Sequence, residues 1–377
     1  MLLHIIAAIV GALVILIILQ DCFETIVLPR RVARKIRVSR LFLKNAWRLA
    51  TWIARKIRST GRRENFISSF GPVALLMLLV LWAAFLIVAF ALLQWSVGSV
   101  LDAPEKIVTF ATDLYMSGTT FFTLGLGDVT PRAGLARIFT VMEGGLGFGF
   151  LALVIGYLPV IYQAFSRREA EITLLDARAG SPPSASEFLR RHIQHQRTEE
   201  LQQFLRDWER WCSELMESHL SYPVLMYYRS QHDRQSWLAA LTIVLDVSAL
   251  VMLGLDNIPE QVGQFTFAIA RHAAVDLSQS TGVAPATHMP ERLSSANFAR
   301  LQELLTSLGI AIRDEESAEM RLATLRSMYE PYVYALSQRL MLELPEWVAT
   351  EETIDDWQSS VWDHFALTSQ RPMKKAG

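Results

Sequence analysis

The sequence predicts an all-α membrane protein with three transmembrane helices, a short re-entrant helix and loop, and a C-terminal all-α cytoplasmic domain. Three apolar runs, Leu2–Leu19, Val73–Trp95 and Leu135–Tyr162, are each long enough to span a bilayer. Residues 1–165 hold 16 Lys/Arg against 8 Asp/Glu, a net charge of +8, and residues 166–377 hold 20 against 29, a net charge of −9. A basic membrane part therefore precedes an acidic soluble part.

The first apolar run, Leu2–Leu19, is predicted to be an uncleaved membrane anchor. A cleaved signal peptide has a basic region before its apolar core and small residues at the cleavage site. Here no Lys or Arg precedes the core, and residues 20–23 offer no such site. The two cysteines, Cys22 and Cys212, lie in different parts of the chain, so no disulfide framework is indicated.

A strongly basic segment follows the anchor. Residues 30–63 carry 13 Lys/Arg and no acidic residue, and their apolar residues recur at roughly helical spacing. This pattern predicts one or two amphipathic helices lying in an anionic headgroup layer, with Trp47 and Trp52 at the interface. Nucleic-acid binding is disfavoured because membrane segments flank the basic residues and no base-reading motif is present.

The same basic residues predict the topology, because Lys/Arg-rich loops stay cytoplasmic. We expect an inner or plasma membrane protein with its N-terminus outside and its C-terminal domain in the cytoplasm. The segment between the second and third runs then enters the membrane from outside. The predicted parts are the N-terminal transmembrane helix (1–20), the basic interfacial segment (21–71), the domain with the re-entrant segment (72–165) and the cytoplasmic helical regulatory or assembly domain (166–377).

The re-entrant segment contains the most informative motif of the chain. Asp102 and Glu105 form a potential capping box before a short predicted helix, 107–118. The loop that follows consists of Thr123, Leu124, Gly125, Leu126, Gly127 and Asp128. Glycines can adopt φ > 0 at little steric cost, so alternating glycines can turn successive carbonyls to one side. A ring of such strands can replace the water shell of a cation.

These residues resemble the filter of the potassium-channel pore-domain family, T-x-G-[YFL]-G-D, and the resemblance covers Val73–Tyr162. It implies a homotetramer that conducts K⁺ passively, with no other cofactor. It also implies ion sites at the carbonyls of Thr123, Leu124, Gly125 and Leu126, and Asp128 at the outer mouth. Two residues depart from the usual pattern, Leu126 in place of an aromatic residue and Phe122 in place of Thr.

Three residues near the filter are candidates for supporting roles. The glycine-rich third run contains Gly147, at the position where the resemblance implies a gating hinge, although small residues also allow close helix packing. Glu143 is the only charge deep in this run, and a role in bracing the filter is favoured over ion binding. Tyr115 is the nearest aromatic residue expected to lack a filter partner, because Leu126 has no hydroxyl group.

The C-terminal part shows helical periodicity and no nucleotide-binding glycine motif. The run Trp237–Leu253 is apolar, but Asp246 at its centre favours a buried soluble helix over a fourth span. Most polar residues here are expected to be satisfied structural groups. If a ligand pocket exists, the candidates are His232, Asp246, His272 and Asp276. The predicted helices are 186–217, 237–253, 265–277, 294–312, 315–342 (kinked or divided at Pro331) and 353–367.

The resulting hypothesis is a tetrameric cation channel, K⁺-selective, with a cytoplasmic domain whose gating role the sequence does not specify. Three alternatives stay open: a non-selective monovalent cation channel, a non-conducting membrane sensor or scaffold, and a membrane-tethered enzyme. The enzyme is disfavoured because the sequence offers no nucleophile or metal-ligand set.

Overall fold

The computed structural model describes residues 1–28, 37–104, 108–193, 198–231, 235–256, 258–313 and 315–349. The chain forms two compact units, Met1–Ala164 and Phe165–Gly377. Within the described residues the strands are the antiparallel pair β1 (Leu101–Asp102) and β2 (Thr130–Pro131). Helices make up most of the rest, and the predicted all-α fold class is confirmed. The predicted helix 353–367 lies outside the described residues.

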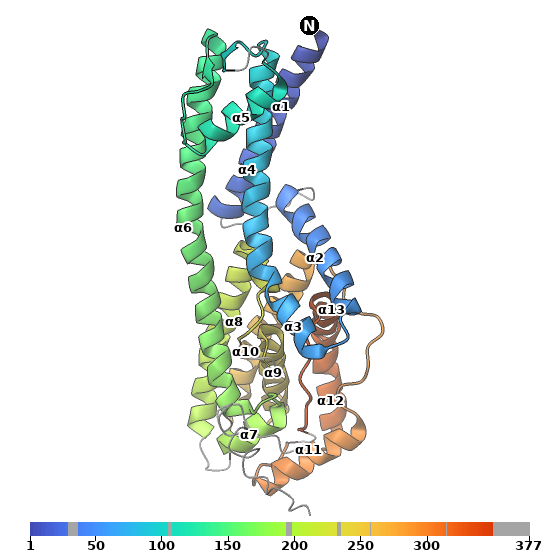
Figure 1. Ribbon diagram of the computed structural model, residues 1–377. Helices are drawn as coiled ribbons and strands as arrows, with labels where there is room; N and C mark the ends of the chain where they lie inside the picture. Colours follow the sequence, from blue (N-terminus) through green and yellow to red (C-terminus); the bar gives the residue numbers. More distant parts are fainter. Residues whose placement is uncertain are drawn as a thin grey trace, which may run out of the picture. The chain divides into compact units, whose positions relative to one another are not determined.

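Among the described residues, three helices are long and apolar enough to cross a membrane, at the positions that the sequence predicts. They are α1 (Leu2–Cys22), which continues as the π-helical turn η1 (Phe23–Val27), α4 (Phe70–Ser96) and α6 (Gly134–Ala179) (Figure 1). The third helix extends well beyond its predicted end at Tyr162. Pro159 lies inside it and does not terminate it. The helix ends before Gly180, whose φ of +86° helical residues do not adopt.

In the N-terminal unit, α1 packs along α4 (Figure 1). Gly11 allows the close approach, since a Cβ there would lie 2.7 Å from the carbonyl oxygen of Ala89. Trp82 and Leu86 of α4 are almost fully buried in the resulting core. The outward-facing residues of α1 are large and apolar and stay exposed, as expected of a surface that contacts lipid.

A buried carboxylate ties the basic segment to these helices. Asp21 at the end of α1 accepts hydrogen bonds from the backbone N–H (2.9 Å) and the hydroxyl (3.0 Å) of Ser39, in the first turn of α2 (Val38–Lys56). Trp82 Nε1 of α4 donates to the same carboxylate at 2.9 Å, and Arg37 lies 3.6 Å from it. One aspartate thus connects three helices and caps one of them.

The predicted amphipathic helix is present as α2, followed by α3 (Thr60–Ser68), but its tryptophans differ. Trp47 is 1% exposed and packs edge-on against Phe70 with ring centroids 4.8 Å apart. The prediction of an interfacial Trp47 is therefore wrong, because this residue faces α4 and belongs to the protein core. Trp52 is 56% exposed, and the Lys56 ammonium lies 3.4 Å from its ring centroid.

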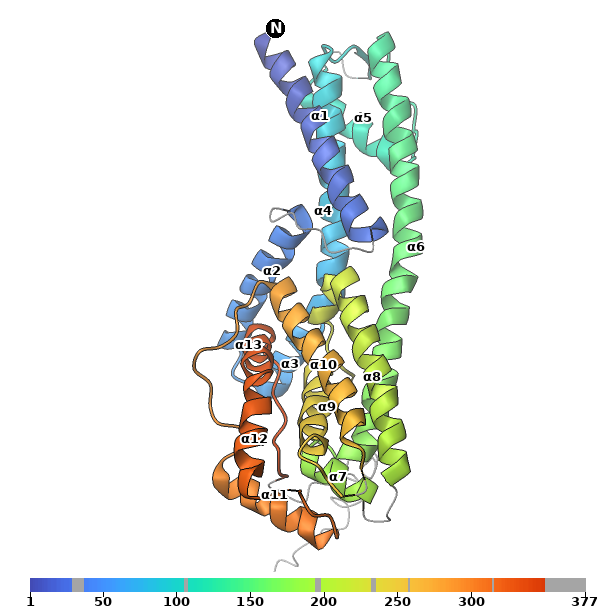
Figure 2. The same ribbon diagram turned by 180° about the vertical axis from the view of Figure 1, so that it is seen from behind.

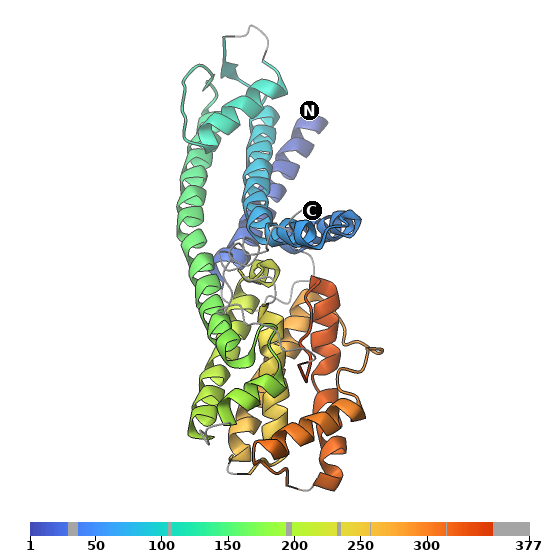
Figure 3. The same cartoon turned by 60° about the horizontal axis from the view of Figure 1, so that its bottom comes forward.

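The short re-entrant helix is α5 (Phe110–Phe121), which lies between α4 and α6 (Figures 1 and 3). Its start differs from the prediction. The Thr112 hydroxyl accepts the backbone N–H of Thr109 at 3.2 Å, so threonines cap this helix. Asp102 pairs with Thr130 in the β1–β2 ladder and does not cap it, and Glu105 lies outside the described residues.

The C-terminal unit is helical and is built around α9 (Trp237–Val251), every residue of which is buried (Figure 2). The predicted buried helix in this region is thus confirmed. The elements α8, α10, α12 and α13 pack against it. The bounds of the others are α7 (Ala185–Ile193), α8 (Thr198–Ser221), η2 (Pro223–Tyr227), α10 (Glu260–Thr281), α11 (Ser295–Ser307), α12 (Glu315–Ser327) and α13 (Glu330–Leu340).

Two predicted helices of this unit each correspond to two helices of the structure. The stretch predicted as one helix over 186–217 contains α7 and α8, and residues 194–197 between them lie outside the described residues. The stretch 315–342 forms α12 and α13, and Pro331 lies in the first turn of α13, where a missing N–H is tolerated. The division expected at this proline is confirmed.

Candidate functional site

The candidate site is the loop between α5 and α6. Three of its residues have positive φ, Thr123 at 57°, Gly125 at 55° and Gly127 at 78°. They alternate with Leu124 and Leu126, whose side chains are 62% and 64% exposed. The glycines adopt this conformation at little cost, whereas a β-branched threonine is strained there. The alternation expected from the sequence is present, and it begins at Thr123, two residues before the first glycine.

The backbone of this loop turns its N–H groups toward α5. The amides of Leu124 (2.8 Å) and Gly125 (3.3 Å) both donate to the carbonyl oxygen of Thr119, at the end of that helix. Among the described residues, none donates a hydrogen bond to the carbonyls of Thr123, Leu124, Gly125 or Leu126. A backbone whose first amides are bonded to the preceding helix and whose carbonyls accept no hydrogen bond can bind a cation.

A buried serine on α5 joins the loop's supporting helices. The Ser117 hydroxyl lies 2.7 Å from the carbonyl oxygen of Ile87 on α4, and it also contacts the Glu143 carboxylate on α6. Ser117 and Glu143 are both fully buried. Glu143 therefore lies behind the loop, in contact with the helix that precedes it. Sequence reasoning singled out Glu143 but missed Ser117, because a lone serine in a short helix has no distinguishing pattern.

Gly147 lies at the tightest contact between α5 and α6. A Cβ on Gly147 would lie 1.9 Å from the carbonyl oxygen of Phe121 and 2.7 Å from its carbonyl carbon. Neighbouring glycines on the same helix, Gly145 and Gly149, have no atom within 4 Å of such a Cβ. Of the two roles considered for Gly147, close packing has a direct structural basis, and the hinge role stays a prediction.

Asp128 ends the loop and is held by Tyr115. The tyrosine hydroxyl donates to Asp128 Oδ2 at 2.8 Å, and the Asp128 carboxylate also accepts the backbone N–H of Val129 at 3.1 Å. The expectation that Tyr115 lacks a filter partner is wrong. Leu126 offers it no hydroxyl. The Tyr115 side chain extends instead from α5 to the carboxylate of Asp128.

The C-terminal residues proposed as a pocket do not converge. His272 is 61% exposed and pairs with Asp276 of its own helix, with 3.4 Å between Nε2 and Oδ2. Asp246 is fully buried and bonds elsewhere, and His232 lies outside the described residues. No group of three or more potential metal ligands occurs in the described part of the chain.

Asp246 is the centre of a buried ion-pair network. Arg292 binds its carboxylate with both Nη atoms, at 2.7 and 3.2 Å, and also contacts Glu330 at 3.0 Å. The Tyr329 hydroxyl donates to Asp246 at 2.5 Å. Burial raises the pKa of Asp246, and Arg292 opposes that shift. Burial alone lowers the pKa of Arg292, but Asp246 raises it above its ordinary value. The network is a structural element made of charged residues. This agrees with the prediction that most polar residues of the C-terminal part are satisfied structural groups.

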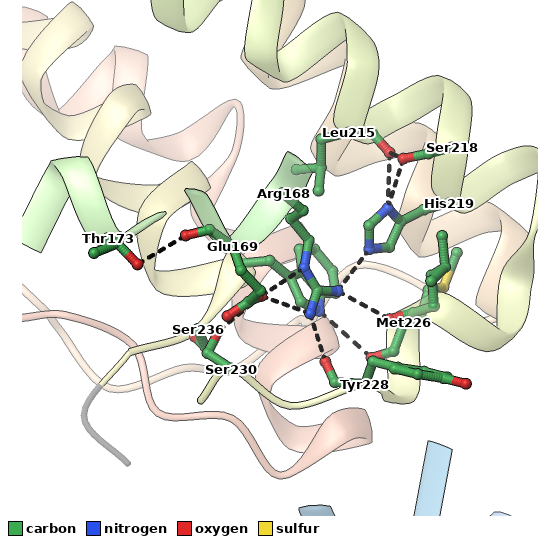
Figure 4. A network of polar contacts seen from close by, with 12 residues as sticks. Arg168, Glu169, Thr173, Leu215, Ser218, His219, Met226, Tyr228, Ser230 and Ser236 are labelled. Carbon is green, nitrogen blue, oxygen red and sulfur yellow. Dashed lines mark hydrogen bonds and ion pairs between the residues drawn. The ribbon is translucent and has the colours of Figure 1, made fainter. Parts of the chain in front are cut away.

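A second buried network surrounds Arg168, in the C-terminal part of α6, and His219 (Figure 4). Their contact joins positions 51 residues apart, so no local pattern could identify it.

Comparison with known proteins shows a family match in the membrane part of the chain. Residues 75–163 match the family described as "Ion channel", which supports the potassium-channel pore-domain family. The chain is 24% identical over 218 residues to "Uncharacterized membrane protein YdjJ" of Bacillus subtilis (strain 168). That alignment covers 56% of this chain and 62% of the relative, so the chain spans less than two thirds of that protein. No solved structure matches the chain significantly.

Proposed function

We propose that this chain, whose membrane part is a pore unit of the potassium-channel type, is one subunit of a homotetrameric K⁺ channel. The observation that carries the proposal is the loop over residues 123–127. The amides of Thr123, Leu124 and Gly125 bond back to α5, and the carbonyls of residues 123–126 accept no hydrogen bond among the described residues. One chain supplies one such strand, and four strands around an axis close a coordination site.

The exposure of the loop supports assembly. Phe122, Leu124 and Leu126 are 59–64% exposed in the single chain. Apolar residues of a rigid loop gain by burial against other subunits, at about 25 cal/mol per Å² of apolar surface. The four-fold arrangement also places the carbonyls that accept no hydrogen bond around one axis. It therefore accounts both for these carbonyls and for the exposed apolar side chains.

Reversal potential under K⁺/Na⁺ bi-ionic conditions tests the proposal, with purified full-length protein in lipid bilayers. A reversal potential near the K⁺ equilibrium value is expected. A current that reverses near zero would favour the non-selective channel, for which the Leu126 and Phe122 departures are the specific observations. No current from a correctly assembled tetramer would favour a non-conducting sensor or scaffold.

The topology and the lipid partner belong to the same proposal. The N-terminus is outside and the C-terminal unit cytoplasmic, as the basic residues of 30–63 suggest. The helix α2 then lies at the inner membrane surface and contacts anionic headgroups through Arg48 and Lys56 and through the exposed Trp52. Protease protection of a C-terminal tag in intact cells tests the orientation, and an accessible tag would refute it.

A further inference from the structure

Arg168 lies where α6 enters the C-terminal unit, and its guanidinium hydrogen-bonds with every N–H group. Its Nε and Nη2 donate to Glu169 at 2.9 and 2.8 Å. Its Nη1 donates to His219 Nε2 at 3.2 Å and to the Leu225 carbonyl at 3.0 Å, and Nη2 also donates to the Tyr228 carbonyl at 2.9 Å (Figure 4). These contacts use all five N–H groups of the guanidinium. The side chain is only 4% exposed.

The contacts hold α6 to three other segments of the unit. His219 is at the end of α8, Leu225 is in η2, and Tyr228 follows it. Because α6 is one continuous helix from Gly134 to Ala179, it contains both Gly147 beside the filter loop and Arg168. We refer to Arg168, Glu169, His219 and the carbonyls of residues 225 and 228 as the Arg168 clamp.

The geometry determines the protonation state that His219 needs. Its Nδ1 lies 2.9 Å from the Leu215 carbonyl, which can only accept, so Nδ1 carries the proton. Its Nε2 faces an arginine, which can only donate, so Nε2 must be an unprotonated acceptor. A proton on Nε2 would turn this hydrogen bond into a contact between two donors and two positive charges.

The surroundings of His219 supply little to offset that repulsion. The residue is 1% exposed. The charged groups that face it come from α6, namely Arg168 and, through Arg168, Glu169. From α9 it meets the uncharged ring of Trp237, at 5.2 Å between centroids, and its own helix contributes the Ser218 hydroxyl at 3.2 Å from Nδ1. Burial and the arginine lower the pKa of His219 well below its ordinary value.

We propose that Arg168 is the positioning residue through which the C-terminal unit controls α6, and that protonation of His219 releases this control. The inference rests on the proposed channel function. At neutral pH the clamp holds the cytoplasmic end of the pore-lining helix to α8 and to the segment 225–230. At acidic pH the clamp opens, because only the open form accommodates the histidinium.

The size of the effect follows from linkage. When the clamp is open, His219 titrates near its ordinary value of 6.5, and when the clamp is closed it titrates far lower. The ratio of open to closed clamp then rises about tenfold between pH 7.5 and 5.5. Above pH 7 it hardly changes, because neither form binds the proton there.

The test measures K⁺ flux in vesicles at equal pH on both sides, with wild type and variants of the full chain. Flux by wild type is expected to shift between pH 7.5 and 5.5. His219→Gln is expected to keep the pH 7.5 level at both values, because a glutamine oxygen can accept from Arg168 and cannot be protonated. His272→Gln, at an exposed histidine of the same unit, is the matched control and should respond as wild type does. A full acid response in His219→Gln overturns the proposal.

A second measurement does not depend on conduction. Hydrogen exchange of the backbone amides in 222–231 and 165–179 is expected to accelerate about tenfold at pH 5.5, after correction for intrinsic rates, in wild type but not in His219→Gln. If wild type carries no current yet shows this exchange pattern, the channel proposal fails and the clamp stands. Exchange that is the same in both proteins refutes the clamp. Arg168→Lys keeps the charge but not the forked geometry, and it should exchange fast at both pH values.

Discussion

The replacement Gly147→Ala tests how the loop over residues 123–127 is supported. The added Cβ would lie 1.9 Å from the Phe121 carbonyl oxygen, whereas contacts below 3.0 Å are essentially never seen. The helices α5 and α6 must therefore separate by about 1.1 Å, the difference between these two distances. Both partners are backbone, so no side-chain rotation can relieve the clash.

The stability that Gly147→Ala loses can be bounded from two free-energy terms. Overpacking a tight contact destabilises by about 1–3 kcal/mol. Alanine in a helix interior gains about 1 kcal/mol over glycine, which offsets part of it. The net loss is therefore up to about 2 kcal/mol per chain, and a four-fold assembly would contain four copies of the strained contact.

Thermal unfolding of the detergent-purified assembly and K⁺ flux in vesicles measure the effect. Gly147→Ala is expected to lower both the unfolding temperature and the K⁺ flux. The control is Gly145→Ala, which gains the same helix propensity on the same helix without meeting any atom within 4 Å in the single chain. It should be as stable as wild type or slightly more stable.

One result would refute the packing argument. If Gly147→Ala is as stable as Gly145→Ala and changes only the rate of channel opening, then the helices tolerate the methyl group. Gly147 would in that case act as the hinge that the resemblance implies.

Three further outcomes are expected. Tyr115→Phe removes the hydrogen bond to the Asp128 carboxylate, about 1 kcal/mol. Under the proposed function, this change should reduce K⁺ flux at low K⁺ while size-exclusion chromatography shows an intact assembly. Arg292→Met leaves Asp246 as an uncompensated buried charge and should lower the unfolding free energy by about 3–5 kcal/mol, whereas the exposed Arg300→Met should change it by under about 0.5 kcal/mol. Stability should fall below pH 6.5 by at most about 1.4 kcal/mol per pH unit, because the unfolded chain then protonates His219 and the folded chain with a closed clamp does not. Opening of the clamp lets the folded chain bind the proton too and makes the fall smaller. His219→Gln should reduce that slope, and an unchanged slope would contradict the assignment.

The features that depend on local pattern could be predicted from the sequence. The three spanning helices follow from apolar length, the buried α9 from an apolar run too short to span, and the division at Pro331 from a missing backbone donor. The positive φ of Gly125 and Gly127 follows from the residue type, because glycine adopts this conformation at little cost. In each case the decisive property belongs to the residues of one segment.

The partners of the polar and aromatic residues could be found only in the tertiary structure. Trp47 and Trp52 occur in one basic amphipathic pattern, yet one is buried against Phe70 and the other is exposed. Tyr115 pairs with Asp128 rather than losing its partner. The reason is that helical periodicity shows which residues share a face, but not which element covers that face.

The same limit applies most strongly to the buried charges. Asp246 meets an arginine 46 residues away, and Arg168 meets a histidine 51 residues away. A buried charge requires a partner, which the sequence indicates, but many residues could supply it, and only the packing of distant helices selects one.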